Sequence, residues 1–183
     1  ISACLVGSEM CIRDSYTYEE IIKTIKRLSF DLNGYYRSLE GEEIVVIALL
    51  DGGLVFAGNL LLELDFNIIF KTAKGPIYVA GKNGRREVTI YENYIPSDVK
   101  GRHVLVLDGL QNTGKTIERT VKNLISYGAV KVKTCVLFKK ENKDKNIVPP
   151  DWFGLLIPNE WVAGFGTDSR DKYRNIKHLQ EQH

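Results

Sequence analysis

The chain has 183 residues, of which 44% are hydrophobic and 26% are charged, and this composition fits one globular domain with a core of ordinary size. The formal net charge is +2 and the basic residues form only short clusters, so we expect no nucleic acid among its partners. No apolar run approaches the roughly 20 residues that span a bilayer, so we expect a soluble, cytoplasmic protein without membrane contact.

The N-terminal stretch LVGSEMCIRDS, residues 5–15, back-translates codon by codon to a transposon adaptor used in preparing sequencing libraries. We therefore interpret residues 1–15 as an artefact outside the fold, with residues 1–4 of uncertain origin, and residues 16–183 as a single domain. A short apolar leader is the alternative, but the stretch lacks a basic start and carries Glu9, Arg13 and Asp14. Without this segment Cys135 is the one cysteine left, and the apolar run TCVLF around it predicts a reduced core residue.

Helical and extended patterns alternate along the rest of the chain. Apolar residues recur at helical spacing over residues 18–39, and Thr17 with Glu20 forms the pattern of a capping box. The run EIVVIALL, residues 43–50, is typical of a strand buried on both faces. Further helices are predicted at 54–64 and 116–127, and further strands at 67–71, 103–108 and 130–138.

Residues 72–102 interrupt this alternation with glycines, prolines and mixed charge around two short strand candidates, 77–79 and 88–91. A long segment of this kind inside a compact domain is typical of a mobile lid or a binding loop. The alternation as a whole predicts an α/β fold with a mostly parallel, twisted sheet flanked by helices. In such sheets ligands bind at the carboxyl ends of the strands.

Residues 109–116, GLQNTGKT, fit two different phosphate-binding patterns. Read as G-x-x-x-x-G-K-[ST], the segment is a P-loop of a nucleoside triphosphatase. Such an enzyme needs a second aspartate at the end of another strand to share Mg²⁺. The strand 130–138 runs into two lysines instead, and Asp51 runs straight into two glycines. Asp108, directly before the loop, suits a phosphorylated sugar better, because its carboxylate can accept hydrogen bonds from ribose hydroxyls.

Several segments together resemble the type I phosphoribosyltransferases, in particular the hypoxanthine-guanine (6-oxopurine) enzymes. HVLVLD followed by GLQNTGKT resembles their loop for the phosphorylated sugar, and LDGG, residues 50–53, resembles their pyrophosphate loop. VLFKK resembles the strand whose lysine contacts the exocyclic oxygen of the purine. DWFGLLIPNEWVAGFGTDSRDKYRNI resembles their C-terminal signature. The resemblance extends from about Ile44 to Arg174 and implies a small C-terminal hood over the sheet.

The resemblance also implies a role for each matched residue. Phosphoribosyl pyrophosphate (PRPP) would bind through its 5′-phosphate and ribose to Asp108, Gly109, Asn112, Thr113, Gly114, Lys115 and Thr116, where a helix N-terminus favours an anion. Asp108 and Asn112 would hold the catalytic positions. Pyrophosphate would bind to Leu50, Asp51, Gly52, Gly53 and Arg174. The base would contact Lys139, Trp161 and Val162, and Asp168 would reach Mg²⁺.

Four departures from the family pattern affect catalysis more than binding. Gly109 stands where the family has a second acidic residue, and Asn112 stands where an aspartate takes the proton from purine N7. An amide is not a useful base near neutral pH, and the loss of general base catalysis costs on the order of 10²–10⁴ in rate. Asp51 stands where lysine is frequent, and the serine-tyrosine pair of the mobile loop is not identifiable between residues 72 and 86.

Three functions therefore stay open. The first is a purine phosphoribosyltransferase of purine salvage that uses Mg²⁺, PRPP and hypoxanthine or guanine and, by resemblance, forms a homo-oligomer. The second is a catalytically weak or silent nucleotide-binding protein on the same fold, and the third is the P-loop triphosphatase. Without the resemblance, Trp161 is a core residue, Lys139 a solvated strand end, and the segment with Asp168 and Arg174 an exposed turn.

Overall fold

The computed structural model describes residues 14–39, 41–80, 86–92, 96–142 and 147–182. Residues 1–13, which hold most of the segment that we interpret as an artefact, lie outside this range. In chain order the elements are β1 (Asp14–Tyr16), α1 (Tyr18–Tyr36), the 3₁₀ helix η1 (Arg37–Leu39), β2 (Ile44–Leu50), α2 (Gly53–Leu61), β3 (Ile68–Ala80), β4 (Arg86–Glu92), α3 (Pro96–Val99), β5 (His103–Gln111), α4 (Lys115–Ser126), β6 (Lys131–Lys140), β7 (Trp152–Ile157), β8 (Val162–Ala163) and β9 (Leu179–Glu181).

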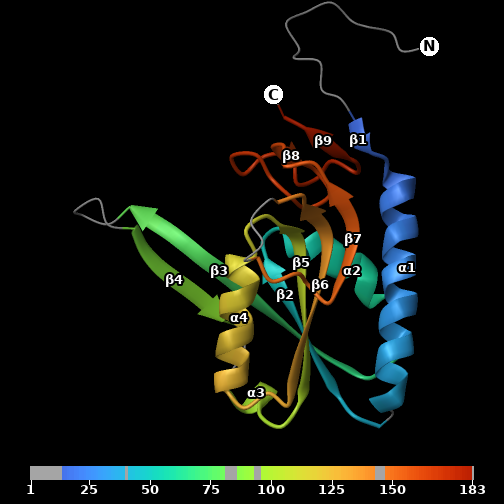
Figure 1. The fold of residues 1–183 in the computed structure, drawn as a ribbon, viewed down its shortest axis with the longest axis vertical. Helices are drawn as coiled ribbons and strands as arrows, with labels where there is room; N and C mark the ends of the chain where they lie inside the picture. Colours follow the sequence, from blue (N-terminus) through green and yellow to red (C-terminus); the bar gives the residue numbers. More distant parts are fainter. Residues whose placement is uncertain (1–13, 40, 81–85, 93–95, 143–146, 183) are drawn as a thin grey trace, which may run out of the picture.

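A six-stranded sheet in the order β4-β3-β2-β5-β6-β7 forms the centre of the molecule (Figure 1). All neighbouring pairs from β3 to β7 are parallel, and β4 is antiparallel at one edge. Helices α1 and α2 cover one face of the sheet and α4 lies on the other. The predicted α/β fold with a mostly parallel sheet is confirmed.

Alternate residues of the central strands supply two separate cores. In β2, Val46 and Ala48 pack under α1 and α2, whereas Val45 and Ile47 point to the opposite face with Ile117 and Leu124 of α4. Nearly all of β2 is therefore buried, which explains its continuous apolar sequence. Cys135 is fully buried in β6 as a free thiol, as predicted.

Helix α1 begins with the predicted capping box. The Glu20 amide donates to Thr17 Oγ1 over 3.2 Å, and the Thr17 amide donates to the Glu20 carboxylate over 2.8 Å. Two of the amides that have no partner inside a helix are thereby satisfied. The helix ends at Tyr36 and tightens into η1, which accounts for the expected extent of 18–39.

The segment 72–102 is more regular than predicted. Strand β3 continues to Ala80 and pairs antiparallel with β4, and this hairpin projects from the edge of the sheet (Figure 1). The expectation of a strand ending at Lys71 is therefore wrong. The register is irregular between Lys74 and Ile77, around Gly75 and Pro76. Proline has no N–H to donate, and such irregularities accommodate it within a strand. Residues 81–85 and 93–95 lie outside the described residues.

Strand β5 is also longer than predicted, because Leu110 pairs with Phe138 and Gln111 with Lys139 of β6. Gly109, Leu110 and Gln111 thus belong to the strand, and only residues 112–114 form the turn before α4. Beyond the carboxyl end of the sheet lies a second small sheet in the order β1-β9-β8. This is the predicted hood, and it includes Asp14 and Ser15 in β1. Within the described ranges, no helix combines the length and apolarity needed to cross a membrane.

Candidate active site

Residues 50–53 connect β2 to α2 at the carboxyl end of the sheet, and we call this segment the loop 50–53. The peptide bond between Leu50 and Asp51 is cis. The glycines of the loop allow close contact with the end of β5. A Cβ atom added at Gly109 would lie 2.4 Å from the carbonyl oxygen of Gly52, and one added at Gly53 would lie 3.3 Å from the carbonyl oxygen of Leu107. The glycine at position 109, where the family pattern has an acid, is therefore required by the packing of this loop.

The C-terminal segment docks onto the other side of the loop 50–53. Gly166 has a φ of +93°, and a Cβ there would lie 2.8 Å from the carbonyl oxygen of Gly52. Arg174 donates through Nη1 to the carbonyl oxygen of Gly166 over 2.8 Å, and the same atom lies 4.0 Å from a Cβ built at Gly52. Three segments distant in sequence thus meet around Gly52.

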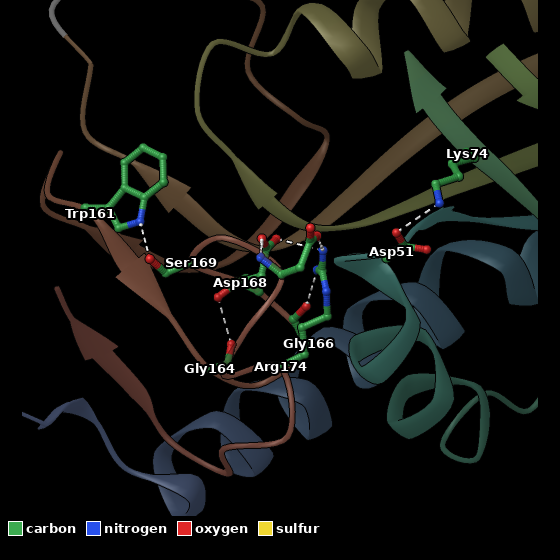
Figure 2. A network of polar contacts seen from close by, with 10 residues as sticks. Asp51, Lys74, Trp161, Gly164, Gly166, Asp168, Ser169 and Arg174 are labelled. Carbon is green, nitrogen blue, oxygen red and sulfur yellow. Dashed lines mark hydrogen bonds and ion pairs between the residues drawn. The ribbon is translucent and has the colours of Figure 1, made fainter. Parts of the chain in front are cut away.

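Asp168 and Arg174 form an ion pair at this junction, with 2.7 Å between Oδ1 and Nη2 (Figure 2). The second carboxylate oxygen of Asp168 accepts from the Asp171 amide over 2.9 Å. Both side chains of the ion pair are about 30% exposed, so ligands can reach them. Among the described residues, no three His, Cys, Asp or Glu side chains gather into a cluster that could hold a metal ion by itself.

Lys74 is a residue of this region that sequence reasoning missed. Its Nζ lies 3.1 Å from Oδ2 of Asp51 (Figure 2). The contact arises because β2 and β3 are parallel and in a register that pairs Leu50 with Lys74. The negative charge of Asp51 is therefore balanced by the ammonium group of Lys74.

The residues predicted to bind the 5′-phosphate include the turn 112–114 at the N-terminus of α4. Gly114 adopts the left-handed conformation with φ of +70° and caps α4, and no side chain occupies the helix N-terminus as a cap. A small cavity of about 110 Å³ lies there, lined by residues 110–114 together with Asp108, Thr116 and Ile117. Free backbone amides at a helix N-terminus favour an anion. Lys115 is exposed and does not line this cavity.

Asp108 lies at the end of the apolar part of β5 and faces the same cavity. Burial raises its pKa to about 7, against hydrogen bonds from the Leu110 and Gly109 amides that act in the opposite direction. A carboxyl group near its midpoint at neutral pH can either accept or donate a hydrogen bond. This position suits contact with sugar hydroxyls.

A second cavity of about 250 Å³ lies on the other side of Asn112. Gln111, Lys139 and Leu156 form one of its walls, because these residues are neighbours across β5, β6 and β7. Lys140, Glu141, Asn142 and Ile147 complete the lining. The exposed Asn112 and the buried Gln111 line both cavities, so Asn112 lies where the two cavities meet.

Lys139 and Trp161, both assigned to the base by the resemblance, do not line the same cavity. Lys139 lines the larger cavity, and its Nζ lies 4.9 Å from the ring centroid of Phe153, which is 38% exposed. Trp161 is 60% exposed and donates to Ser169 Oγ over 3.2 Å, so its interpretation as a core residue is wrong (Figure 2). Neither Trp161 nor the buried Val162 of β8 lines the larger cavity.

Lys140 connects these two regions. It lines the larger cavity, and its Nζ lies 5.9 Å from the ring centroid of Trp161. Lys140 is only 7% exposed, and desolvation lowers its pKa. Sequence reasoning overlooked it because only the first lysine of VLFKK matched the family pattern.

Gln111 was missed as well. Its Nε2 donates to the carbonyl oxygen of Val148 over 3.1 Å and lies 2.7 Å from a Cβ built at Gly114. Within the described residues, its buried Oε1 has no hydrogen-bond partner. Gln111 therefore joins the turn 112–114 to the chain that leads into β7.

Comparison with known proteins agrees with this geometry. The family model of the phosphoribosyl transferase domain matches residues 14–170. The chain belongs to the phosphoribosyltransferase family. It is 30% identical over 167 residues to the hypoxanthine-guanine-xanthine phosphoribosyltransferase of Tritrichomonas foetus, covering 88% of this chain and 86% of that protein.

Two further similar proteins support the same family. The identity to the hypoxanthine phosphoribosyltransferase of Haemophilus influenzae is 27% over 157 residues, covering 85% of this phosphoribosyltransferase and 86% of the relative. A crystal structure of a hypoxanthine-guanine phosphoribosyltransferase from Bacillus anthracis has a TM-score of 0.78 at 25% identity, covering 94% and 99% of the two chains. The predicted family and enzyme class are confirmed, and the triphosphatase alternative loses its support. The adaptor interpretation stays a prediction.

Proposed function

We propose that the protein transfers the 5-phosphoribosyl group of PRPP to a 6-oxopurine, hypoxanthine or guanine, giving a nucleoside monophosphate and pyrophosphate in purine salvage. The observation that carries the proposal is the pair of cavities that share Asn112 and Gln111. One is suited to a phosphate and the other is the size of a small organic ring. The relatives named above have names that include hypoxanthine, which supports the choice of base.

The sugar phosphate is assigned to the smaller cavity. The amides of the turn 112–114 and the N-terminus of α4 bind the 5′-phosphate, with hydroxyls from Thr113 and Thr116. Gly114 permits the left-handed turn that aims these amides. Asp108 contacts the ribose hydroxyls, and Lys115 adds positive charge from outside the cavity. Gly109 supplies no carboxylate, so one ribose contact of the family is missing here.

The pyrophosphate group is assigned to the loop 50–53 and Arg174. The backbone of Leu50, Asp51, Gly52 and Gly53 surrounds the leaving group, and the Arg174 guanidinium beside Gly52 stabilises its negative charge. Asp168 orients that guanidinium through the 2.7 Å ion pair.

Mg²⁺ fits this arrangement as a cofactor held mainly by the substrate. A magnesium ion is usually bound through one or two carboxylates together with substrate phosphates and water. Asp168 offers one partly exposed carboxylate beside the proposed diphosphate site. When bound, the ion neutralises charge on the leaving group.

The base is assigned to the larger cavity. Lys139 donates to the exocyclic oxygen of the purine from the cavity wall. Trp161 supplies a flat, exposed aromatic face for stacking, and Val162 contacts the base through its backbone. Lys140, which lines the cavity, places the Trp161 ring next to the cavity, since the Lys140 Nζ lies 5.9 Å from the ring centroid.

A silent or weak nucleotide-binding protein on the same fold is the second candidate. Asn112 favours it, because its amide lies between the two cavities where a proton acceptor is needed and cannot take a proton. Both candidates predict monophosphate binding, and only the first predicts product. A homo-oligomer and a cytoplasmic location also stay proposals, testable by light scattering and by cell fractionation.

Calorimetry with PRPP, guanosine monophosphate and ATP, followed by a product assay, tests the proposal. We expect PRPP and the monophosphate to bind and the monophosphate to form from PRPP and base. Thr116→Ala should weaken monophosphate binding by roughly 1–3 kcal/mol, the cost of a hydrogen bond to a charged group. Thr120→Ala is the control, because its hydroxyl donates to the Thr116 carbonyl within α4. Binding of ATP alone, or equal affinity in both variants, would contradict the proposal.

A further inference from the structure

The charges around the loop 50–53 form two pairs that flank Gly52. Asp51, next to Gly52 in the chain, is paired with Lys74, and Asp168 is paired with Arg174 (Figure 2). Of the two cations, only Arg174 was predicted to contact pyrophosphate. On the basis of the proposed function, we propose that Lys74 is a second cation of the pyrophosphate site, which Asp51 holds in the free protein and the diphosphate of PRPP takes over.

The position of Lys74 follows from the sheet. Lys74 is the partner of Leu50 across the parallel strands β2 and β3, so its backbone lies beside the first residue of the loop 50–53. The irregular register of the β3–β4 hairpin begins directly after it. The side chain reaches over the loop, and its Nζ lies 3.1 Å from Asp51 Oδ2.

The ion pair is open to exchange. The Lys74 and Asp51 side chains are 38% and 47% exposed, so a ligand can reach both groups. A pair this exposed contributes little stability, since water screens it. Phosphate oxygens are stronger competitors for an ammonium group than a single carboxylate, because each diphosphate carries several charges. Arg174 has the same arrangement on the opposite flank, with Nη1 4.0 Å from a Cβ built at Gly52.

Electrostatics requires such a cation. Asp51 places a carboxylate at the mouth of the proposed diphosphate site, and without a nearby cation it would repel the substrate. Lys74 cancels this charge in the free protein. In the complex, its ammonium group lies between the Asp51 carboxylate and the diphosphate and attracts both.

The experiment measures the Kd of PRPP with Mg²⁺ by calorimetry, with guanosine monophosphate as a reference ligand that has no diphosphate. Lys74→Met should weaken PRPP binding about tenfold and leave monophosphate binding unchanged. Lys74→Arg should recover most of the loss. Asp51→Asn should strengthen PRPP binding severalfold, because it removes the competing carboxylate and leaves the cation. In the Lys74→Met background, Asp51→Asn should also strengthen PRPP binding, because it removes the repulsion between the Asp51 carboxylate and the diphosphate.

Lys71→Met is the matched control. Lys71 is on the same strand and also has a carboxylate partner, since its Nζ lies 3.2 Å from Asp98 Oδ2. It lies three residues before Lys74 and away from the loop, so neither affinity should change. A thermal melt of each variant verifies that it is folded.

Two results would overturn the inference alone. One is PRPP binding by Lys74→Met as tight as by the parent, and the other is an equal loss for PRPP and the monophosphate, which would indicate a structural role. If the parent protein binds the monophosphate and not PRPP, the proposed function is overturned as well. That result is seen before any substitution is made, so the two failures can be told apart.

Discussion

Gly109→Ala should show how closely the loop 50–53 and β5 depend on each other. The added Cβ would lie 2.4 Å from the carbonyl oxygen and 2.9 Å from the carbonyl carbon of Gly52. These are backbone atoms and cannot rotate away. The loop must retreat by about 1 Å to restore ordinary contact, which begins near 3.4 Å. Overpacking of this kind costs about 1–3 kcal/mol of stability, and a misplacement of ~1 Å at a site can cost ~10² in turnover.

The assay combines chemical denaturation with calorimetry. We expect Gly109→Ala to lose stability and PRPP affinity and to retain most of its monophosphate affinity, since the turn 112–114 is not displaced. Gly58→Ala is the control, because a Cβ at Gly58 in α2 meets nothing within 4 Å. It should gain up to about 1 kcal/mol from helix propensity. Parent-like stability and PRPP affinity in Gly109→Ala would refute the packing argument.

Two other predictions concern the base and the pH dependence. Trp161→Leu should have a free energy of unfolding within about 1 kcal/mol of that of the parent, because the ring is 60% exposed, and it should lose purine affinity. A large shift of the melting temperature with intact purine binding would contradict stacking. For Asp108, whose pKa is raised to about 7, the folded protein holds the proton more tightly than the unfolded chain, so stability should fall as pH rises from about 4 to above 7. This fall in the free energy of unfolding is a few kcal/mol at most, and Asp108→Asn should remove it in unfolding curves at pH 4, 6 and 8. The same pH dependence of stability in both proteins would contradict the raised pKa of Asp108.

Much of the backbone could be predicted because its signals are local. Thr17 and Glu20 form a capping box through contacts three residues apart. Strand β2 has no polar residue from Ile44 to Leu50 because it is buried on both faces. The Asp-Gly-Gly end of that strand and the glycine that caps α4 mark places where the backbone must turn tightly.

The side chains that surround the site depend on contacts between distant segments, which a single sequence does not contain. Lys74 reaches Asp51 only through the register of β2 and β3. The requirement for Gly109 comes from the carbonyl oxygen of Gly52. Gly75 and Pro76 read as a loop signal, yet the irregularity they cause is absorbed inside the hairpin. Trp161 was ambiguous because an aromatic residue beside VAGF suits either a core or an open face.

We propose that this site joins a purine base to the ribose of PRPP and that residue 112 holds the position of the general base. The most direct test of this claim is the steady-state rate of monophosphate formation from PRPP with hypoxanthine or guanine, in the presence of Mg²⁺, for the parent and Asn112→Asp. We predict slow formation by the parent, with one pyrophosphate released for each monophosphate. Asn112→Asp should increase the rate by up to ~10²–10⁴ with little change in affinity. No monophosphate from either protein would contradict the claim, and a fast parent without gain in the variant would remove residue 112 from proton transfer.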